Sequence, residues 1–339
     1  MSYRPLLQSL TLLVLVLAGI AGCASPGDRF RGDGEPAPRL EPQQLIAHDG
    51  YRLLLHHWTV DEPRAVVLAL HGFNDHGGGF SAIAKRFNDH QVSLYAYDQR
   101  GFGGSEPRGF WPGHELLAQD ALTAAGLLRQ RYPQQPVYLL GKSMGGAVAM
   151  LAVDAAPEAV NGSLLVAPAV WSRDTMPWYQ RFSLWLGSSL APGATLPSSL
   201  GGRLGIRASD DNDMLRALGQ DPMMLHGARI GTVSGLATLM DRALAASSRI
   251  PGPALILYGD NDQVIPAPPM CRMVQQLPLR QGHKWRMILY PDGYHMLTRY
   301  SGTGQVVEDM LAWLEHPGIT PLPSGHEVSR VEAKTTLCD

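Results

Sequence analysis

Gly141-Lys142-Ser143-Met144-Gly145 decides the fold, because this pentapeptide joins an apolar run to a helix-like run. The run before it is Val-Tyr-Leu-Leu at 137–140, and the run after it is Gly-Ala-Val-Ala-Met-Leu-Ala at 146–152. A serine with glycine two residues away on each side, between a strand and a helix, is typical of a nucleophile elbow. The serine takes a strained backbone position there, and flanking side chains would collide with the neighbouring strand and helix. The pattern therefore predicts Ser143 as a nucleophile.

Gly-Lys-Ser also ends the phosphate-binding loop of nucleotide-binding proteins, which follows a strand and opens a helix in the same way. That loop needs a glycine five residues before Gly141, so that backbone amides can wrap the phosphates. Pro136 stands at this position, and the intervening residues are the strand itself. The sequence thus argues against a nucleotide site.

Length and composition indicate a large globular protein. The chain has 339 residues, enough for one large domain or two small ones, and its hydrophobic content of 45% excludes a disordered chain. Its 28 basic and 30 acidic residues nearly balance, which gives no electrostatic footprint for nucleic acid. We therefore expect no nucleic-acid partner.

The N-terminus predicts a signal peptide over residues 1–22. Arg4 precedes an apolar run over 10–20, which is too short to span a bilayer but suits the apolar core of a signal sequence. Cys23 follows Ala21-Gly22, and this arrangement resembles the bacterial lipoprotein signal, which implies cleavage before Cys23 and lipidation of that cysteine. An ordinary secretory signal is the alternative. Ala24, rather than aspartate, follows the cysteine, which favours an outer-membrane anchor facing the periplasm.

The rest of the chain divides into a tether, a core, an insertion and a tail. Residues 23–43 are rich in proline, glycine and charge, which predicts a flexible tether. Apolar runs alternate with helical stretches over 44–170 and 250–316, which indicates a mostly parallel sheet covered by helices on both faces. Residues 171–249 are too long for a crossover loop and predict a helical cap. We expect the tail, 317–339, to extend over the surface.

Aromatic residues recur on one face of the first predicted cap helix, at Trp178, Phe182 and Trp185. We expect them to pack the cap onto the body or to line an acyl tunnel. Cys271 and Cys338 are a disulfide candidate in an oxidising compartment, and two unpaired thiols are the alternative, because sequence alone cannot supply their separation.

A serine hydroxyl is a poor nucleophile at neutral pH and needs a base within hydrogen-bond reach. In sheets that carry this elbow, the acid and then the base follow on loops after later strands. Asp262 and His295 come after the last two apolar runs of the core, so they are the predicted acid and base. We expect Asp260 and Asp292 to shape the turns in which they lie.

The developing negative charge of an acyl-transfer reaction needs two backbone amides as donors. Met144 follows the nucleophile and is the first predicted donor. Phe73 is the second, because it lies in the glycine-containing turn after the run at 65–70.

Other charged residues near these motifs invite a metal or catalytic interpretation. His71, Asp75 and His76 lie together in one loop, but the loop lacks a convincing set of three ligands, so we expect no metal and no cofactor. Asp98 and Arg100 belong to a tight glycine-rich turn and are expected to brace loops. Lys142 is expected to be a solvated charge or a neighbour of the site.

Taken together, the motifs resemble the monoglyceride lipase and lysophospholipase group of α/β-hydrolases, within the wider set of serine aminopeptidase-like hydrolases. The matching segments are 71–76, 98–105, 141–146, 259–262 and 293–295, in the order in which that family carries them. The resemblance spans about residues 45–315. It implies the α/β-hydrolase fold with a helical cap, the triad Ser143, Asp262 and His295, and the oxyanion donors Phe73 and Met144. Two residues depart from the usual pattern: Lys142 replaces a histidine, and Asp75 replaces a glutamate.

The sequence thus predicts a lipid-anchored serine ester hydrolase that acts on single-chain acyl lipids, such as monoacylglycerols or lysophospholipids, through an acyl-enzyme. A general carboxylesterase or a serine aminopeptidase would use the same triad, and a non-catalytic envelope lipoprotein could keep the same fold. The acyl chain, the head group and the oligomeric state stay open.

Overall fold

The structure, a computed structural model, describes residues 29–30, 32, 37–197, 205–279 and 285–338. The predicted signal peptide and Cys23 lie outside the described residues. Among the helices that the structure describes, none has the length and apolar character needed to cross a bilayer.

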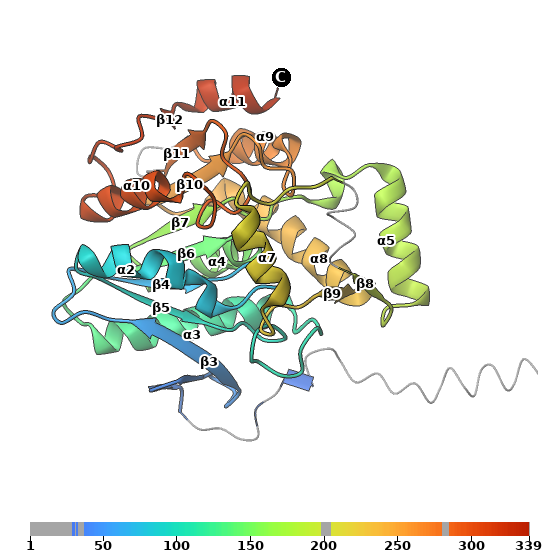
Figure 1. Cartoon of the computed structure of the whole chain (residues 1–339), viewed down its shortest axis with the longest axis horizontal. Helices are drawn as coiled ribbons and strands as arrows, with labels where there is room; N and C mark the ends of the chain where they lie inside the picture. The colour runs from blue at the N-terminus through green and yellow to red at the C-terminus, as the bar shows by residue number, and fades with distance from the viewer. Residues whose placement is uncertain (1–28, 31, 33–36, 198–204, 280–284, 339) are drawn as a thin grey trace, which may run out of the picture.

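The apolar runs form a ten-stranded sheet with the strand order β1-β2-β3-β5-β4-β6-β7-β10-β11-β12 (Figure 1). Its strands are β1 (Arg39–Glu41), β2 (Gln44–Ile46), β3 (Arg52–Trp58), β4 (Ala65–Leu70), β5 (Val92–Tyr97), β6 (Val137–Lys142), β7 (Gly162–Val166), β10 (Ala254–Gly259), β11 (Trp285–Tyr290) and β12 (Glu327–Val328). The strands from β5 to β11 pair in parallel, and the outer strands pair antiparallel. The predicted mostly parallel sheet is confirmed.

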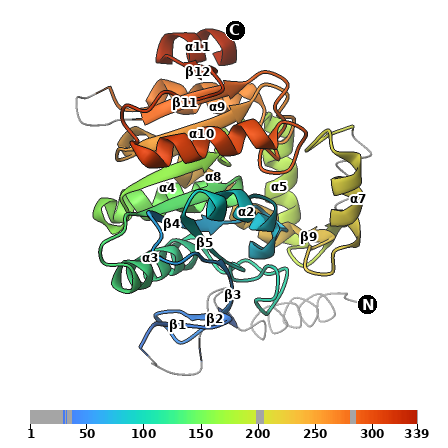
Figure 2. The same ribbon diagram turned by 60° about the vertical axis from the view of Figure 1, so that its left-hand side comes forward.

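Helices cover both faces of the sheet, because alternate side chains of each central strand point to opposite sides. In β4, Val66 and Leu68 belong to one hydrophobic cluster, and Ala65 and Val67 belong to the other. The first face packs against α3 (His114–Arg131), α4 (Met144–Ala155), α8 (Ile230–Ala246), α9 (Ala267–Gln276) and α11 (Arg330–Cys338). The second packs against α2 (Ser81–Asp89) and α10 (Thr303–Glu315) (Figure 2).

The predicted tether is partly ordered. Phe30 is fully buried in the main cluster, and its carbonyl accepts a hydrogen bond from the Arg100 guanidinium. Strand β1 also falls inside the predicted tether and pairs with β2. The sequence did not predict either feature, because one buried aromatic residue and a three-residue strand produce no periodic hydrophobic pattern.

Arg100 braces this end of the molecule, as the sequence predicts. Its guanidinium is fully buried and donates to both carboxylate oxygens of Asp120 and of Asp49. These charge-assisted hydrogen bonds connect the turn after β5 to helix α3 and to the β2–β3 hairpin.

The segment between β7 and β10 differs from the predicted cap in its boundary. It contains α5 (Trp178–Leu190), α7 (Asn212–Gln220) and α8, together with a small antiparallel sheet of β8 (Thr195–Pro197) and β9 (Gly227–Arg229). Helix α8 packs on α4, and its residues Ala237, Leu239 and Ala243 join the main core. The cap is therefore shorter than 171–249, because the apolar face of α8 packs on α4 and α3 and belongs to the core. The sequence did not predict this, since no strand signal adjoins α8.

The first cap helix presents its aromatic residues to solvent. Trp178, Phe182 and Trp185 on α5 are 76%, 52% and 61% exposed, so they do not pack the cap onto the body. Trp171, at the base of the cap, is partly buried against the main core.

The predicted extended tail is instead anchored. Strand β12 pairs with β11, and helix α11 packs on α9, where it buries Ala333 and Leu337. Cys338 forms a disulfide with Cys271 of α9, with their Cα atoms 5.1 Å apart. This bond resolves the alternative of two free thiols and closes the C-terminal helix onto the core.

Candidate active site

Ser143 lies between β6 and α4 in a sterically forced turn. Its backbone has φ 53° and ψ −117°, a conformation that costs a non-glycine residue about 1–3 kcal/mol. A Cβ on Gly145 would lie 2.1 Å from the carbonyl oxygen of Leu70, and a Cβ on Gly141 would lie 2.3 Å from the carbonyl oxygen of Gly145. Both glycines are therefore required, because helix α4 begins in contact with the end of β4.

Ser143, His295 and Asp262 are joined by hydrogen bonds. His295 Nε2 lies 2.9 Å from Ser143 Oγ, and His295 Nδ1 lies 2.7 Å from Asp262 Oδ2. The three residues are at most 8% exposed. With Nδ1 protonated and donating to the carboxylate, Nε2 presents its lone pair to the serine hydroxyl, which is the tautomer that a general base needs.

Asp262 is fixed by its own loop. Its Oδ1 accepts from the backbone N–H groups of Val264 and Ile265 at 2.8 and 2.9 Å, which leaves Oδ2 for His295. Burial and the nearby carboxylate of Asp292 raise the pKa of Asp260. Of the aspartates in these loops, the structure places Asp262 on the histidine.

The loops that carry the acid and the base touch directly. The Asn261 N–H donates to the carbonyl oxygen of Gly293 at 2.9 Å, and a Cβ on Gly259 would lie 2.2 Å from that oxygen. The Met296 N–H donates to the carbonyl of Ala208, which ties the His295 loop to the cap segment. Backbone contacts on both sides thus set the position of His295.

The two predicted oxyanion donors border the elbow. A Cβ on Gly72 would be only 3.4 Å from the Cβ of Ser143, so the turn that contains Phe73 approaches the serine closely. The Asp75 N–H donates to Gly72 O and closes this turn, with Asn74 at φ 61°. Met144 is the first residue of α4, where helical N–H groups have no intrahelical acceptor and the helix dipole favours negative charge.

A buried ion-pair cluster, which the sequence did not predict, connects three parts of the site. The Lys142 ammonium lies 3.0 Å from Asp75 Oδ2, and the Arg299 guanidinium donates to both oxygens of Asp75 at 3.0 and 2.8 Å. All three residues are at most 8% exposed. Burial alone would raise the pKa of Asp75, but the charges of Lys142 and Arg299 outweigh it and hold that pKa well below its ordinary value.

The cluster joins the elbow, the Phe73 turn and the His295 loop through one carboxylate, because Lys142 precedes the serine and Arg299 follows the histidine. Removal of one partner from such a buried pair costs about 3–5 kcal/mol. Gly79 makes room for the guanidinium, since a Cβ there would lie within 2.6 Å of Arg299 Cζ. Lys142 is therefore a buried neighbour of Ser143 and not a solvated charge. The sequence did contain a signal for this ion pair: a lysine directly before the elbow serine and an acidic residue in the loop after β4.

His71, Asp75 and His76 do not converge on one point. His71 Nδ1–H donates to Gly72 O, and its Nε2 accepts from the Gln99 N–H, so both ring nitrogens are used. Burial lowers the pKa of His71 and favours this neutral form. The His76 ring instead reaches Asp221 of the cap, with Nε2 3.0 Å from Oδ2.

Comparison with known proteins places the chain among hydrolases. The family model described as serine aminopeptidase, S33, matches residues 61–299. A monoacylglycerol lipase of Mycolicibacterium smegmatis is 28% identical over 272 residues, which cover 78% of this chain and 93% of the relative. The monoglyceride lipase of Rattus norvegicus is 24% identical over 294 residues, which cover 83% and 95%.

Solved structures show the same fold. A soluble variant of monoglyceride lipase from Saccharomyces cerevisiae, in complex with a substrate analog, superposes with a TM-score of 0.68 at 19% identity, over 86% of this chain and 99% of that one. A monoacylglycerol lipase from Paleococcus ferrophilus gives a TM-score of 0.63 at 21% identity, over 77% and 98%. The chain has the α/β-hydrolase fold and belongs to the serine aminopeptidase S33 family of hydrolases.

Proposed function

We propose that this protein is a serine ester hydrolase that cleaves single-chain acyl lipids of the monoacylglycerol type through an acyl-enzyme. The observation that carries the proposal is the continuous line of hydrogen bonds from Asp262 through His295 to Ser143 at the elbow. The curated relatives from M. smegmatis and R. norvegicus, which are named monoacylglycerol and monoglyceride lipases, support the substrate class.

The proposed reaction gives each of these residues a step. His295 Nε2 takes the proton of Ser143 as the hydroxyl oxygen attacks the ester carbonyl, and Asp262 stabilises the imidazolium that forms. The amides of Phe73 and Met144 donate to the oxyanion of the tetrahedral intermediate. His295 then protonates the leaving alcohol. A water molecule, deprotonated by the same histidine, attacks the acyl-enzyme and releases the fatty acid.

The exposed apolar surface of the cap supports a lipid substrate. Trp178, Phe182 and Trp185 line a hollow of about 510 Å³ between α5 and α8. Exposed apolar clusters on a soluble domain mark sites of interaction, and tryptophan is typical of lipid–water interfaces. A domain that takes its substrate from a membrane or micelle would use such a surface.

A substrate panel distinguishes this function from its alternatives. We expect the wild-type protein to release fatty acid from long-chain monoacylglycerols faster than it cleaves acetyl esters or the N-terminal residue of peptides. Ser143→Ala should lower kcat by about 10⁵–10⁶-fold, because the nucleophile is lost. Free fatty acid and free amine are measured in the same samples, with Ser143→Ala as the blank.

Faster release of amino acids would favour the aminopeptidase, and a preference for acetyl esters would favour the general carboxylesterase. Absence of any turnover above the blank would favour a non-catalytic binding protein.

Phe73→Pro tests the oxyanion assignment. Residue 73 is the second residue of the 72–75 turn, a position that accepts proline, and the substitution removes the N–H group together with the aromatic ring. We expect kcat to fall by about 10²–10³-fold with KM little changed. Phe73→Ala is the matched control, because it removes the ring that packs on Phe102 but keeps the amide. Equal losses in the two variants would assign the effect to packing and contradict the role of the amide.

We further propose that the mature protein is anchored to the outer membrane by lipid on Cys23 and faces the periplasm. The apolar run, the small residues and the cysteine at the end of the signal peptide support this anchoring. Cys23→Ser should move the protein from the membrane fraction to the soluble fraction, as measured by fractionation and by the mass of the N-terminal peptide. An unmodified Cys23 in a soluble wild-type protein would contradict the anchor.

A further inference from the structure

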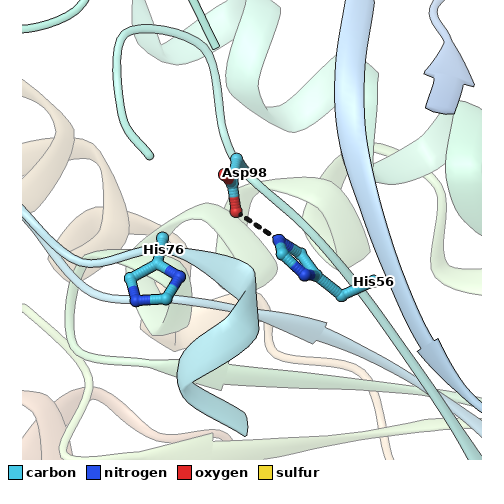
Figure 3. Close-up of side chains that lie close together, drawn as sticks. All are labelled: His56, His76 and Asp98. Atoms are coloured by element: carbon cyan, nitrogen blue, oxygen red, sulfur yellow. Dashed lines mark hydrogen bonds and ion pairs between the residues drawn. The ribbon is translucent and has the colours of Figure 1, made fainter. Parts of the chain in front are cut away.

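We propose that His56, His76 and Asp98 form a binding site for a divalent transition-metal ion of the zinc type, separate from the hydrolase triad. The three side chains come from β3, from the loop after β4 and from the end of β5 (Figure 3). One ligand atom from each residue lies within 4.8 Å of the other two. Two imidazoles and one carboxylate are a ligand set that suits zinc and leaves a coordination position for water.

His76 has a ring nitrogen that the protein leaves without a partner. Its Nε2 lies 3.0 Å from Asp221 Oδ2, so the proton of the neutral ring is held on Nε2. The other nitrogen, Nδ1, then carries a lone pair. It is buried and has no hydrogen-bond partner among the described residues, and the residue is only 9% exposed. A buried acceptor of this kind calls for a ligand.

The contact between His76 and Asp221 is the arrangement that metal-binding histidines use. Such a histidine almost always donates its second ring N–H to a carboxylate or carbonyl, which fixes the ring and raises the basicity of the metal-binding nitrogen. The aspartate of the proposed site is oriented in a similar way, since Oδ1 and Oδ2 of Asp98 accept from the N–H groups of Gly77 and Gly104, each at 2.7 Å.

His56 supplies the third ligand. Its Nε2 lies 2.9 Å from Asp98 Oδ1, and its side chain is 22% exposed, so it can turn and an ion can enter. When the ion binds through Nε2, the single proton of the neutral His56 ring moves to Nδ1, so that Nε2 presents its lone pair to the metal. Zinc–ligand distances of about 2.0–2.1 Å place tetrahedral ligand atoms about 3.4 Å apart, so side-chain rotation has to close the group by at most about 1.4 Å.

Gly78 keeps the space in front of the histidines open. A Cβ on this residue would lie 2.9 Å from His76 Nδ1 and 3.4 Å from His56 Cε1. An ion at this point would join β3 to the loop of Phe73 and, through Asp221, to the cap. From the sequence, His71, Asp75 and His76 lack a convincing set of three ligands, and no metal is expected. In the structure His76 lies instead beside His56 of β3 and Asp98 at the end of β5.

Zinc binding by tag-free mature protein, stripped with a chelator, tests the proposal. Isothermal titration calorimetry with ZnCl₂ should show one equivalent bound, and Co²⁺ should give the visible absorption bands of a four-coordinate site. We expect His56→Gln and His76→Gln each to weaken binding by at least about tenfold, and Asp221→Asn to weaken it by about 10–100-fold. Gly78→Ala should weaken binding as well, since it fills the site without removing a ligand.

His57→Gln is the matched control. His57 is the next residue of β3, its side chain points to the opposite face, and its Nε2 contacts the carbonyl of Pro42. This variant should bind zinc like the wild type. Absence of saturable binding by the wild type would overturn the site. Unchanged binding by correctly folded His76→Gln and His56→Gln, checked by circular dichroism, would overturn it equally.

Discussion

The contact between the start of α4 and the end of β4 is the constraint on which the rest of the structure depends. Gly145 lies so close to the carbonyl of Leu70 that no side chain fits between them, and Ser143 is held at a positive φ as a result. The same contact brings the serine against Gly72 and beside the first amide of α4. One backbone contact thus places Ser143, the predicted nucleophile, and the two predicted oxyanion donors together, at the edge of the sheet where the parallel strands end.

Asp75 provides the second constraint, and it explains two residues that depart from the monoglyceride lipase pattern. A lysine before the nucleophile would be a buried, unpaired charge without the carboxylate of Asp75, and Asp75 in turn binds Arg299. The three loops that meet around the serine are therefore held by charge-assisted hydrogen bonds in a dry environment, where such bonds are strong. The same network holds the loop that carries His295, since Arg299 lies in that loop and binds Asp75.

Much of this arrangement could be predicted because it rests on local signals. The elbow, the apolar runs and the order of Ser143, Asp262 and His295 can each be recognised from a short segment of sequence. The apolar runs and the helical stretches between them predict the sheet and its covering helices. Features that depend on long-range contacts could not be predicted. Phe30 is one lone aromatic residue in a tether, α8 lacks a flanking strand signal, and the partners of Lys142 and His76 are supplied by segments far away along the chain.

A fluorophosphonate probe tests the central claim most directly, because it reacts only with a serine that its own site has activated. Intact-mass and peptide mass spectrometry of the labelled protein should show one phosphonyl adduct on the peptide that contains Ser143, and none on Ser143→Ala. No adduct on the folded wild-type protein, or an equal adduct on Ser143→Ala, would contradict the account.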